Sequence, residues 1–552
     1  MSQRLANGET RLRLNLTNRI RNQCLPVRKC KPPGLDIAAR LISPVALFFC
    51  IAVCHAQSSW AHLGQNGRLV YSTTSRGDRI PDFSSAGYRG GGVALPFVKS
   101  RVTVSPSEGA DDTPVIQSAL DKVARLPLDA HGERGAVELA PRRFHLTGTL
   151  AIHASGVVLR GTAAIGSNAS VVELAGAPHL AISVQGQYHQ CELSPPTWIT
   201  DRYVPAGSVA IHLADASAIR PGDWLEIVKP VTDAWRHLMG MDHLVRHGNP
   251  ETWVKNNIRV LRRVVSVQGN TVRFQVPLTD SFDGQLYSAR QATVTRVEIT
   301  GRVTEAGIED LQILAPNRSI AYRVDAEFDG VDMDNVVDSW LRYVAFVDTT
   351  DSVRIDQHAE RLTIFGVDVR QHSIVTSHAQ PTDFSVSGSQ ILFDRCTAQG
   401  DRVTYVGTQS RSEGPIVVLH CRFSGSGQLE GHQRWSTGLL VDGCDVSDGS
   451  IDLRNRGEMG SGHGWTLGWS VLWNDKASTI TVQNPPGALN WSIGDTGVQL
   501  DAPMPVLTRQ MVRTCRAVSL NPPVTRSNHA SLYLKQLRER LGVQATAAIG
   551  YS

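Results

Sequence analysis

Short apolar segments of equal length recur in the C-terminal half of the chain. ILFDRC (391–396), IVVLHC (416–421) and LLVDGC (439–444) align on their cysteines, which lie 25 and 23 residues apart. Each segment is too short for an independent sheet and must stack on its neighbours. A repeat of this length is typical of a solenoid. Further copies are SVLWND (470–475), LTIFGV (362–367) and WLRYVA (340–345). The pattern predicts the main coils of a parallel β-helix over residues 301–520.

Equivalent positions on successive turns of such a coil lie about 4.8 Å apart. The three aligned cysteines, Cys396, Cys421 and Cys444, should therefore form an inward ladder of small buried side chains. A disulfide between stacked cysteines is the alternative, because the ladder spacing is close to disulfide reach. A second inward column is expected three residues earlier, at Phe393, Val418, Val441 and Leu472.

The N-terminal part carries the start of the coil. DDTPVIQSALDKVA (111–124) places apolar residues at helical spacing and predicts an amphipathic helix that caps the open end of the coil. GAVELAPRRFHLTGTLAIHASGVVLRG (135–161) alternates as short strands with turns between them. We assign residues 57–110 to an extended segment and 111–191 to the first turns with their capping helix.

The period breaks between residues 192 and 300. Apolar alternation with turns at Pro221-Gly222 and Gly269-Asn270 predicts an antiparallel β insert. Its middle, 233–254, is rich in Trp, His and Met. Two interpretations remain open for it: a lid over a binding groove, or a helix that packs into the core of the insert. Near the C-terminus, SLYLKQLRERLGVQA (531–545) predicts an amphipathic helix, and we expect 521–552 to cap the other end of the coil.

The order of the N-terminal motifs resembles a known family. D-D-T-x-x-I-Q-x-A-L (111–120), V-x-L-x-P-x-x-F (137–144) and S-G-V-V-L-R-G (155–161) are similar to the start of right-handed parallel β-helix proteins of the pectate-lyase superfamily. The stretches 77–96 and 460–465 resemble a secreted bacterial branch of it. The resemblance covers most of the chain after residue 56. It implies the fold, whereas polysaccharide chemistry is implied only weakly, because this fold hosts several activities.

The first 56 residues have the composition of an export signal. Basic residues precede the apolar run LISPVALFFCIAVC (41–54), and Cys-His-Ala before Gln57 is compatible with cleavage after Ala56. The apolar run has 14 residues, which is short for a membrane span. We therefore expect a bacterial protein that is secreted or periplasmic, with no membrane attachment after cleavage.

Removing this segment changes the charge and the cysteine count. The chain has 55 basic and 51 acidic residues, of which the first 56 positions hold nine and two, leaving 46 against 49. The apparent basicity thus belongs to the signal, and bulk charge does not support a nucleic-acid partner. Five of the nine cysteines remain, at spacings that match no zinc site.

Polar and aromatic residues crowd among glycines between residues 455 and 477. This stretch holds three Trp, two Asn, one His and five Gly in 23 positions. His432 lies 11 residues after Cys421 and Asn455 lies 11 after Cys444, so the two should stack on adjacent turns. We assign catalysis to His463, His432, Arg434 and Arg456. We assign substrate binding to Asn455, Trp465, Trp473, Asn474, Trp491 and His420.

These residue types suit elimination on a uronate-containing polysaccharide. A base must remove the C5 proton, and a cation must neutralise the carboxylate of the sugar. Glycoside hydrolysis by a protein of the same fold is an alternative, but it needs a carboxyl pair, and spacing singles out none among Glu430, Asp442, Asp452 and Glu458. Non-catalytic polysaccharide binding is a second alternative. Ordinary packing of the Trp side chains is a third.

No cofactor is assigned, and Ca²⁺ stays open, since lyases of the superfamily often use it. Ca²⁺ takes six to eight oxygen ligands. The acidic stretch VDAEFDGVDMDNVVDS (324–339) lacks the spacing of a calcium-binding loop, and we expect it to be a solvated loop. The predicted partner is a polysaccharide, and the protein is expected to be a monomer.

Overall fold

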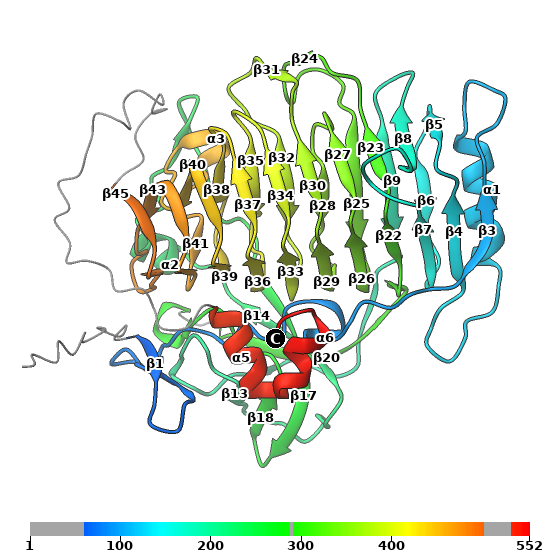
Figure 1. The fold of residues 1–552 in the computed structure, drawn as a ribbon. Helices are drawn as coiled ribbons and strands as arrows, with labels where there is room; N and C mark the ends of the chain where they lie inside the picture. Colours follow the sequence, from blue (N-terminus) through cyan, green and yellow to red (C-terminus); the bar gives the residue numbers. More distant parts are fainter. Residues whose placement is uncertain (1–59, 288–290, 502–530) are drawn as a thin grey trace, which may run out of the picture. The chain divides into compact units, whose positions relative to one another are not determined.

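The chain folds into a right-handed parallel β-helix with an antiparallel insert. The computed structural model describes residues 60–287, 291–501 and 531–552. The predicted signal segment, 1–56, and most of the stretch between the last coil and the C-terminal helix lie outside these residues. Most turns of the coil run through three strands, which build three faces that we call the first, second and third face (Figure 1).

The first face is one parallel sheet. Its strands, in order along the coil, are β3 Ser100–Val104, β4 Gly135–Leu139, β7 Val157–Arg160, β22 Gly307–Glu309, β26 Val336–Arg342, β29 Glu360–Phe365, β33 Ile391–Asp394, β36 Glu413–Leu419, β39 Ser436–Asp442, β42 Val471–Trp473 and β44 Trp491–Ile493. Two short strands pair with strands inside this sheet: β21 Val303–Thr304 with β26, and β41 Leu467–Gly468 with β39.

The second and third faces form a continuous parallel sheet. The second face contains β5 Arg143–Leu146, β8 Val171–Leu174, β23 Gln312–Leu314, β27 Ala345–Val347, β30 Asp368–Arg370, β34 Thr397–Gln399 and β37 Arg422–Ser424. The third face contains β6 Leu150–Ile152, β9 Leu180–Gln185, β25 Asp329–Asp334, β28 Val353–Ile355, β32 Thr382–Val386, β35 Thr404–Thr408 and β38 Gln428–Gly431. The last three strands, β40 Asp445–Leu453, β43 Lys476–Val482 and β45 Thr496–Leu500, run through both faces.

The inward columns predicted from the repeat are confirmed. Phe393 pairs with Val418, Val418 with Val441, and Val441 with Leu472. The aligned cysteines Cys396, Cys421 and Cys444 are free and buried in the same core. The backbone N–H of Cys396 donates to Sγ of Cys421 at 3.3 Å.

A single left-handed residue turns the chain from the first face to the second. Positive φ values recur directly after the first-face strands, at Asp310, Tyr343, Gly366, Arg395, His420, Gly443, Asn474 and Gly494. This region of φ bends the backbone sharply and is uncommon for residues other than glycine. Backbone geometry is therefore the main constraint on which residue occupies each of these positions.

The predicted N-terminal cap forms as α1 Thr113–Ala124. Its apolar residues Ile116, Ala119, Leu120 and Val123 are buried in the core of the coil. Asp112 accepts from the backbone N–H of His145, which ties the start of the helix to the first turn. Within the described ranges, no helix has the length and apolar character that crossing a bilayer requires.

The insert is antiparallel, as predicted. Its main strands are β10 His189–Glu192, β11 Thr197–Trp198, β13 Ala210–His212, β14 Trp224–Lys229, β17 Ile258–Gln268, β18 Thr271–Phe274 and β20 Thr293–Thr300. The short pairs are β12 Tyr203–Val204 with β19 Phe282–Asp283, and β15 Val245–Arg246 with β16 Asn249–Pro250. The 3-10 helix η2 spans Gly284–Leu286, and a short helix, α2 Asp233–Leu238, precedes the β15–β16 hairpin. Two further pairs lie outside the insert: β1 Ala61–Leu63 with β2 Leu69–Tyr71, and β24 Ser319–Ile320 with β31 Ile374–Val375.

The C-terminal helix forms, but its predicted place at the end of the coil is wrong. Helices α5 Leu532–Leu541 and α6 Val543–Ala548 lie beside the first face (Figure 1). Ser531 Oγ and the backbone N–H of Tyr533 both donate to Asp442, at the end of β39. The helix docks here because its buried side chains, Leu532, Tyr533, Gln536 and Leu537, meet the N-terminal segment instead of the last turn.

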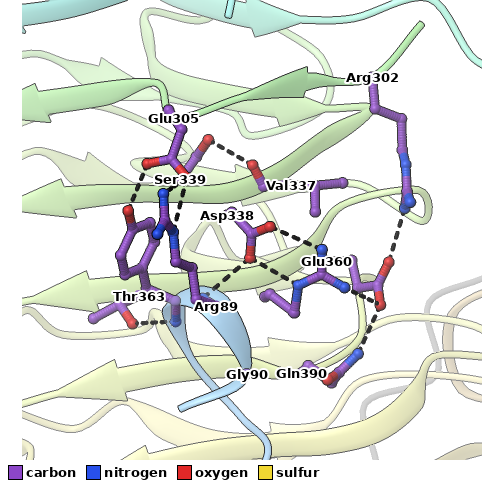
Figure 2. Close-up of polar contacts among 12 residues, drawn as sticks. Arg89, Gly90, Arg302, Glu305, Val337, Asp338, Ser339, Glu360, Thr363 and Gln390 are labelled. Carbon is purple, nitrogen blue, oxygen red and sulfur yellow. Dashed lines mark hydrogen bonds and ion pairs between the residues drawn. The ribbon is translucent and has the colours of Figure 1, made fainter. Parts of the chain in front are cut away.

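That N-terminal segment, residues 81–92, crosses the first face as a strap. The 3-10 helix η1 Tyr88–Gly90 sits over β26 and β29 (Figure 2). Tyr88 Oη donates to Glu305 at 2.5 Å, and the guanidinium of Arg89 donates to the same carboxylate at 2.9 Å. Arg361 holds Asp338 through two hydrogen bonds of 2.7 and 2.8 Å. This network explains the conspicuous Gly-Tyr-Arg-Gly-Gly-Gly stretch as a docking element.

Candidate functional site

A row of polar side chains runs along the outer surface of the third face. On β25, Val331 and Met333 are buried in the core, so Asp332 between them points outward. Register pairs it with Arg354, and the same column continues strand by strand. The column contains Ser183, Asp332, Arg354, Ser385, Gly407, Glu430, Asp452 and Thr481. Neighbours in this column are about 4.8 Å apart.

Glu430 is the centre of a histidine–arginine cluster, by which we mean Glu430, His432, Arg454, Arg456 and His463. No part of the Glu430 side chain is exposed. Its Oε1 lies 2.5 Å from Nη1 of Arg456 and 3.0 Å from Nδ1 of His432, and its Oε2 lies 3.5 Å from Nη2 of Arg454. Burial alone would raise the pKa of Glu430, but Arg456 and His432 outweigh it and hold the pKa below its usual range. The buried carboxylate is therefore ionised and compensated by its cationic neighbours.

His432 is the exposed member of this cluster. Its side chain is 27% exposed, at the end of β38. Glu430 holds Nδ1, and within the described residues Nε2 has no hydrogen-bond partner. Arg456 also donates to the backbone carbonyl of His432 at 3.0 Å. The arrangement fixes the ring and leaves its outer nitrogen available for proton transfer.

His463 lies beside His432 but is enclosed. The two ring centroids are 4.9 Å apart, and His463 is only 7% exposed. Burial, together with the positive charge of Arg456, lowers the pKa of His463 to about 3. Its Nδ1 is buried and has no partner in the described part of the chain. His463 is thus a neutral, packed ring, and it fits a supporting role better than the catalytic one that we predicted.

Arg434 ties two loops together. Its Nη2 donates to the backbone carbonyl and the hydroxyl of Ser461, and it lies 3.7 Å from Oε1 of Glu251 in the insert. Its backbone is left-handed, with φ of 49°. The guanidinium is occupied by these contacts, so Arg434 fits a supporting role better than the catalytic one that we predicted.

The structure brings only some of the predicted binding residues to this cluster. The backbones of Asn455 and Trp465 form an isolated antiparallel β-bridge. The indole N–H of Trp465 donates to the backbone carbonyl of Met239. Both residues shape the loop that carries His463. The sequence placed Asn455 beside His432, but Arg454 takes that place because Glu430 pairs with Asp452. The turn after Cys444 is one residue shorter than the turn after Cys421.

Four predicted binding residues lie elsewhere. Trp473 is fully buried and Trp491 is 4% exposed, and both pack in the core that the outer side of the first face shares with the insert and the terminal segments. His420 and Asn474 are left-handed turn residues between the first and second faces. His420 Nδ1 lies 3.2 Å from the hydroxyl of Tyr551 near the C-terminus. Both residues serve the turn, and neither belongs to the histidine–arginine cluster.

Sequence reasoning missed an acidic cluster on the same face. The stretch 324–339, expected to be a solvated loop, forms β25 and the start of β26. One carboxylate oxygen each from Glu327, Asp329 and Asp351 lies within 4.8 Å of the others. Asp332 and Asp356 stand next to them. The missed signal was the alternation Val-Asp-Met-Asp (331–334), which is the pattern of a half-buried strand.

The acidic cluster contains carboxyl groups whose pKa values are raised toward neutral pH. Burial and the charge of Asp351 raise the pKa of Asp329 to about 6. Burial and the adjacent carboxylate of Asp356 raise the pKa of Asp332 to about 7. Asp332 and Asp356 are hydrogen-bonded to each other, so one proton serves two carboxyl groups.

This cluster does not match the needs of Ca²⁺. With one oxygen from each carboxylate, the group supplies three of the six to eight oxygen ligands that the ion takes. Two of them already face guanidinium groups: Arg354 Nη2 lies 3.5 Å from Asp329, and Arg323 Nη2 lies 3.6 Å from Asp351. Arginine side chains and shared protons therefore offset the negative charge of these carboxylates.

Comparison with known proteins gives fold similarity only. No family model matches the chain, and no curated protein matches it. Similar solved structures include the tailspike protein gp49 from Pseudomonas phage LKA1, at 13% identity over 70% of this chain and 72% of that chain, with a TM-score of 0.37. The Gp54 tailspike of Acinetobacter baumannii bacteriophage AP22, in complex with a capsular saccharide, shares 12% identity over 70% and 71%, with a TM-score of 0.26. A mutant tailspike of E. coli bacteriophage HK620 shares 8% identity over 72% and 58%, with a TM-score of 0.39. Likeness at this level assigns no site and no activity.

Proposed function

We propose that the protein binds an acidic polysaccharide on its third face and cleaves it by β-elimination at the histidine–arginine cluster. The observation that carries this proposal is the Glu430–His432 pair. A buried, ionised carboxylate orients Nδ1 of a partly exposed imidazole and leaves Nε2 unpaired. An oriented imidazole of this kind is suited to general-base catalysis.

In this reaction His432 takes the proton from C5 of a uronate residue. The electron pair of that C–H bond forms the C4=C5 double bond, and the C4–O bond to the neighbouring sugar breaks. The leaving oxygen receives a proton from water or from the imidazolium. The cations beside His432 would lower the energy of the carboxylate-stabilised intermediate. Arg456 is the nearest of them, 3.1 Å from Nδ1 of His432.

The shape of the third face supports a long substrate. Past Arg354, which faces the acidic cluster, the outer column reaches the histidine–arginine cluster through Ser385 and Gly407 on β32 and β35. These small residues keep the surface between the two clusters low. A polymer laid along the coil could therefore contact both clusters at once.

Glycoside hydrolysis is the second candidate, favoured by Asp332. An acid catalyst must hold its proton near neutral pH, and the pKa of Asp332 is raised to about 7. The hydrogen bond between Asp332 and Asp356 is shorter than the separation of about 5 to 9.5 Å between the two carboxyls of a glycosidase. A hydrolytic mechanism would therefore need Asp329 or a movement of Asp356 as the second group.

A paired assay distinguishes these proposals. Purified protein from residue 57 onward is offered a panel of uronate-containing and neutral polysaccharides, with and without chelator. Absorbance of an unsaturated product together with new reducing ends supports elimination, and reducing ends alone support hydrolysis. Retention of polysaccharide without either product would contradict cleavage and leave binding.

Variants connect the activity to the residues. His432→Ala should lower elimination by about 10² to 10⁴-fold, and Asp332→Asn should leave elimination within a few-fold. His145→Ala is the matched control, because His145 lies on β5 of the second face. A full effect of Asp332→Asn with no effect of His432→Ala would move the catalytic site to the acidic cluster.

We also propose that the chain is exported with cleavage after Ala56 and acts as a monomer. The basic n-region and the apolar run 41–54 support export. The mass of the mature N-terminal peptide and light scattering during gel filtration test the two statements. A retained N-terminus or a trimer mass would contradict them.

A further inference from the structure

The insert shares its core with the coil. Trp235 and Trp253 of the insert and Trp435 of the coil form one aromatic group. Their ring centroids are 5.0 Å apart for Trp235–Trp253, 5.5 Å for Trp235–Trp435 and 6.1 Å for Trp253–Trp435. Of the two interpretations of residues 233–254, packing is correct, but the core belongs to both parts.

Trp253 also contacts the backbone of the loop that carries His463. Its side chain is fully buried, and its Nε1 donates to the backbone carbonyl of His463 at 2.9 Å. The next residue is Gly464, with φ of 57°. A Cβ atom there would lie 2.5 Å from Nε1 and from Cδ1 of Trp253. Only glycine permits both this backbone angle and this approach.

The same loop holds Arg456 in place. The backbone N–H of Arg456 donates to the carbonyl of Gly464 at 2.8 Å, and the N–H of Gly464 donates to the carbonyl of Gly457 at 2.9 Å. The guanidinium of Arg456 then reaches Glu430 and the carbonyl of His432. A continuous series of direct contacts thus leads from Trp253 to the cluster.

We propose that Trp253 is a positioning residue for the histidine–arginine cluster, fixing loop 455–465 so that Arg456 and His463 keep their places against His432. The effect of Trp253 on turnover rests on the function proposed above. Its effect on the loop does not. The insert, in this account, is part of the site without supplying a group that touches the reacting atoms.

Trp253→Phe tests the proposal in the full chain. Phenylalanine keeps an aromatic ring in the group but removes the N–H donor, which leaves the carbonyl of His463 without that bond. Amide hydrogen exchange at Arg456 and Gly464 should become at least about 10-fold faster, because both amides depend on the loop conformation. The imidazole of His463, followed by NMR, should begin to titrate between pH 5 and 7 as the loop loosens.

Trp235→Phe is the matched control. Trp235 stacks on Trp253, but within the described residues it makes no hydrogen bond to loop 455–465. Its variant should leave exchange at Arg456 and Gly464 within about two-fold of the wild type. If elimination is observed, Trp253→Phe should lower kcat about 10-fold or more while KM changes by less than about three-fold, as expected for misplaced catalytic groups.

Two outcomes would overturn the proposal. One is unchanged exchange and unchanged His463 titration in Trp253→Phe. The other is an equal rise in exchange over the whole coil in both Trp variants, which would mean that Trp253 only stabilises the fold. Because exchange and titration are measured without substrate, a failure of the proposed polysaccharide chemistry would leave this test intact.

Discussion

Nδ1 of His432 lies 3.0 Å from Oε1 of Glu430, a carboxylate that is fully buried under the outer surface of the third face. The pairing is unusual for an ordinary surface histidine, because an ionised buried carboxylate is costly unless cations and hydrogen bonds compensate it. Here Arg454 and Arg456 complete the compensation. The cluster therefore has a stability consequence as well as a chemical one.

Glu430→Gln should destabilise the fold by about 3–5 kcal/mol. Removing the charge leaves Arg456, whose side chain is 10% exposed, without its main anionic partner, and breaking a buried pair has a cost of this size. The free energy of unfolding in urea measures the loss. Glu458→Gln is the control, because this exposed glutamate lies at the start of the same loop, and it should change stability by less than about 0.5 kcal/mol.

The fold should be less stable at pH 8 than at pH 5. Burial raises the pKa of Asp442 and of Asp495 to about 7, and the pKa of Asp383 to about 8, from an ordinary value of 3.8. These groups bind protons more tightly in the folded chain. Their contribution is therefore complete below about pH 4 and is lost as pH rises through 7 to 8.

Comparison of the wild type with Asp442→Asn isolates one such group. Asparagine keeps an oxygen that can accept from Ser531 and Tyr533, and it removes the ionisation. The pH 5 to pH 8 difference in unfolding free energy should shrink by up to about 3 kcal/mol, since one pKa unit corresponds to about 1.4 kcal/mol. An identical pH dependence in both proteins would show that Asp442 does not titrate in this range.

Tyr88 should hold the strap, residues 81–92, on the first face of the coil. Tyr88 Oη donates to Glu305, which is 6% exposed, and the ring stacks edge-on against Trp340 with centroids 5.4 Å apart. Tyr88→Phe keeps the ring contact but leaves a buried acceptor with one partner fewer, so stability should fall by about 1–3 kcal/mol. Tyr343→Phe, at an exposed turn position, should have little effect. Equal midpoints for all three proteins in thermal unfolding would contradict this role for Tyr88.

The ladder cysteines, Cys396, Cys421 and Cys444, should not react with thiol reagents in the folded protein. Burial raises the pKa of the Cys421 thiol well above its usual value, and thiols react as thiolates. In a Cys515→Ala version of the mature chain, only the exposed Cys191 should react quickly with a thiol reagent. The other three thiols should react with the reagent only after the protein unfolds. Fast reaction of a second thiol, located by peptide mass mapping, would contradict the ladder.

Several features followed from the sequence because they depend on local spacing. The period of the apolar segments determined the inward columns, from Phe393 to Leu472, since equivalent positions of a coil must stack. The helical spacing in 113–124 and the turn residues at Gly222 and Gly269 likewise determined α1 and the insert strands. His432 was placed near the site because it follows its cysteine at a fixed distance.

Other features depended on contacts between distant segments. The backbone of His463 is held by the insert, through Trp253, 210 residues away. Arg454, and not Asn455 as predicted, lies beside His432, because the turn after Cys444 is one residue shorter than the turn after Cys421. A shift of one residue reverses which side chains face outward. The acidic strand, and the docking of α5 on Asp442, were decided by which buried surfaces could pair. Local spacing determined the coil, and packing between distant parts of the chain decided which of its polar residues form a site.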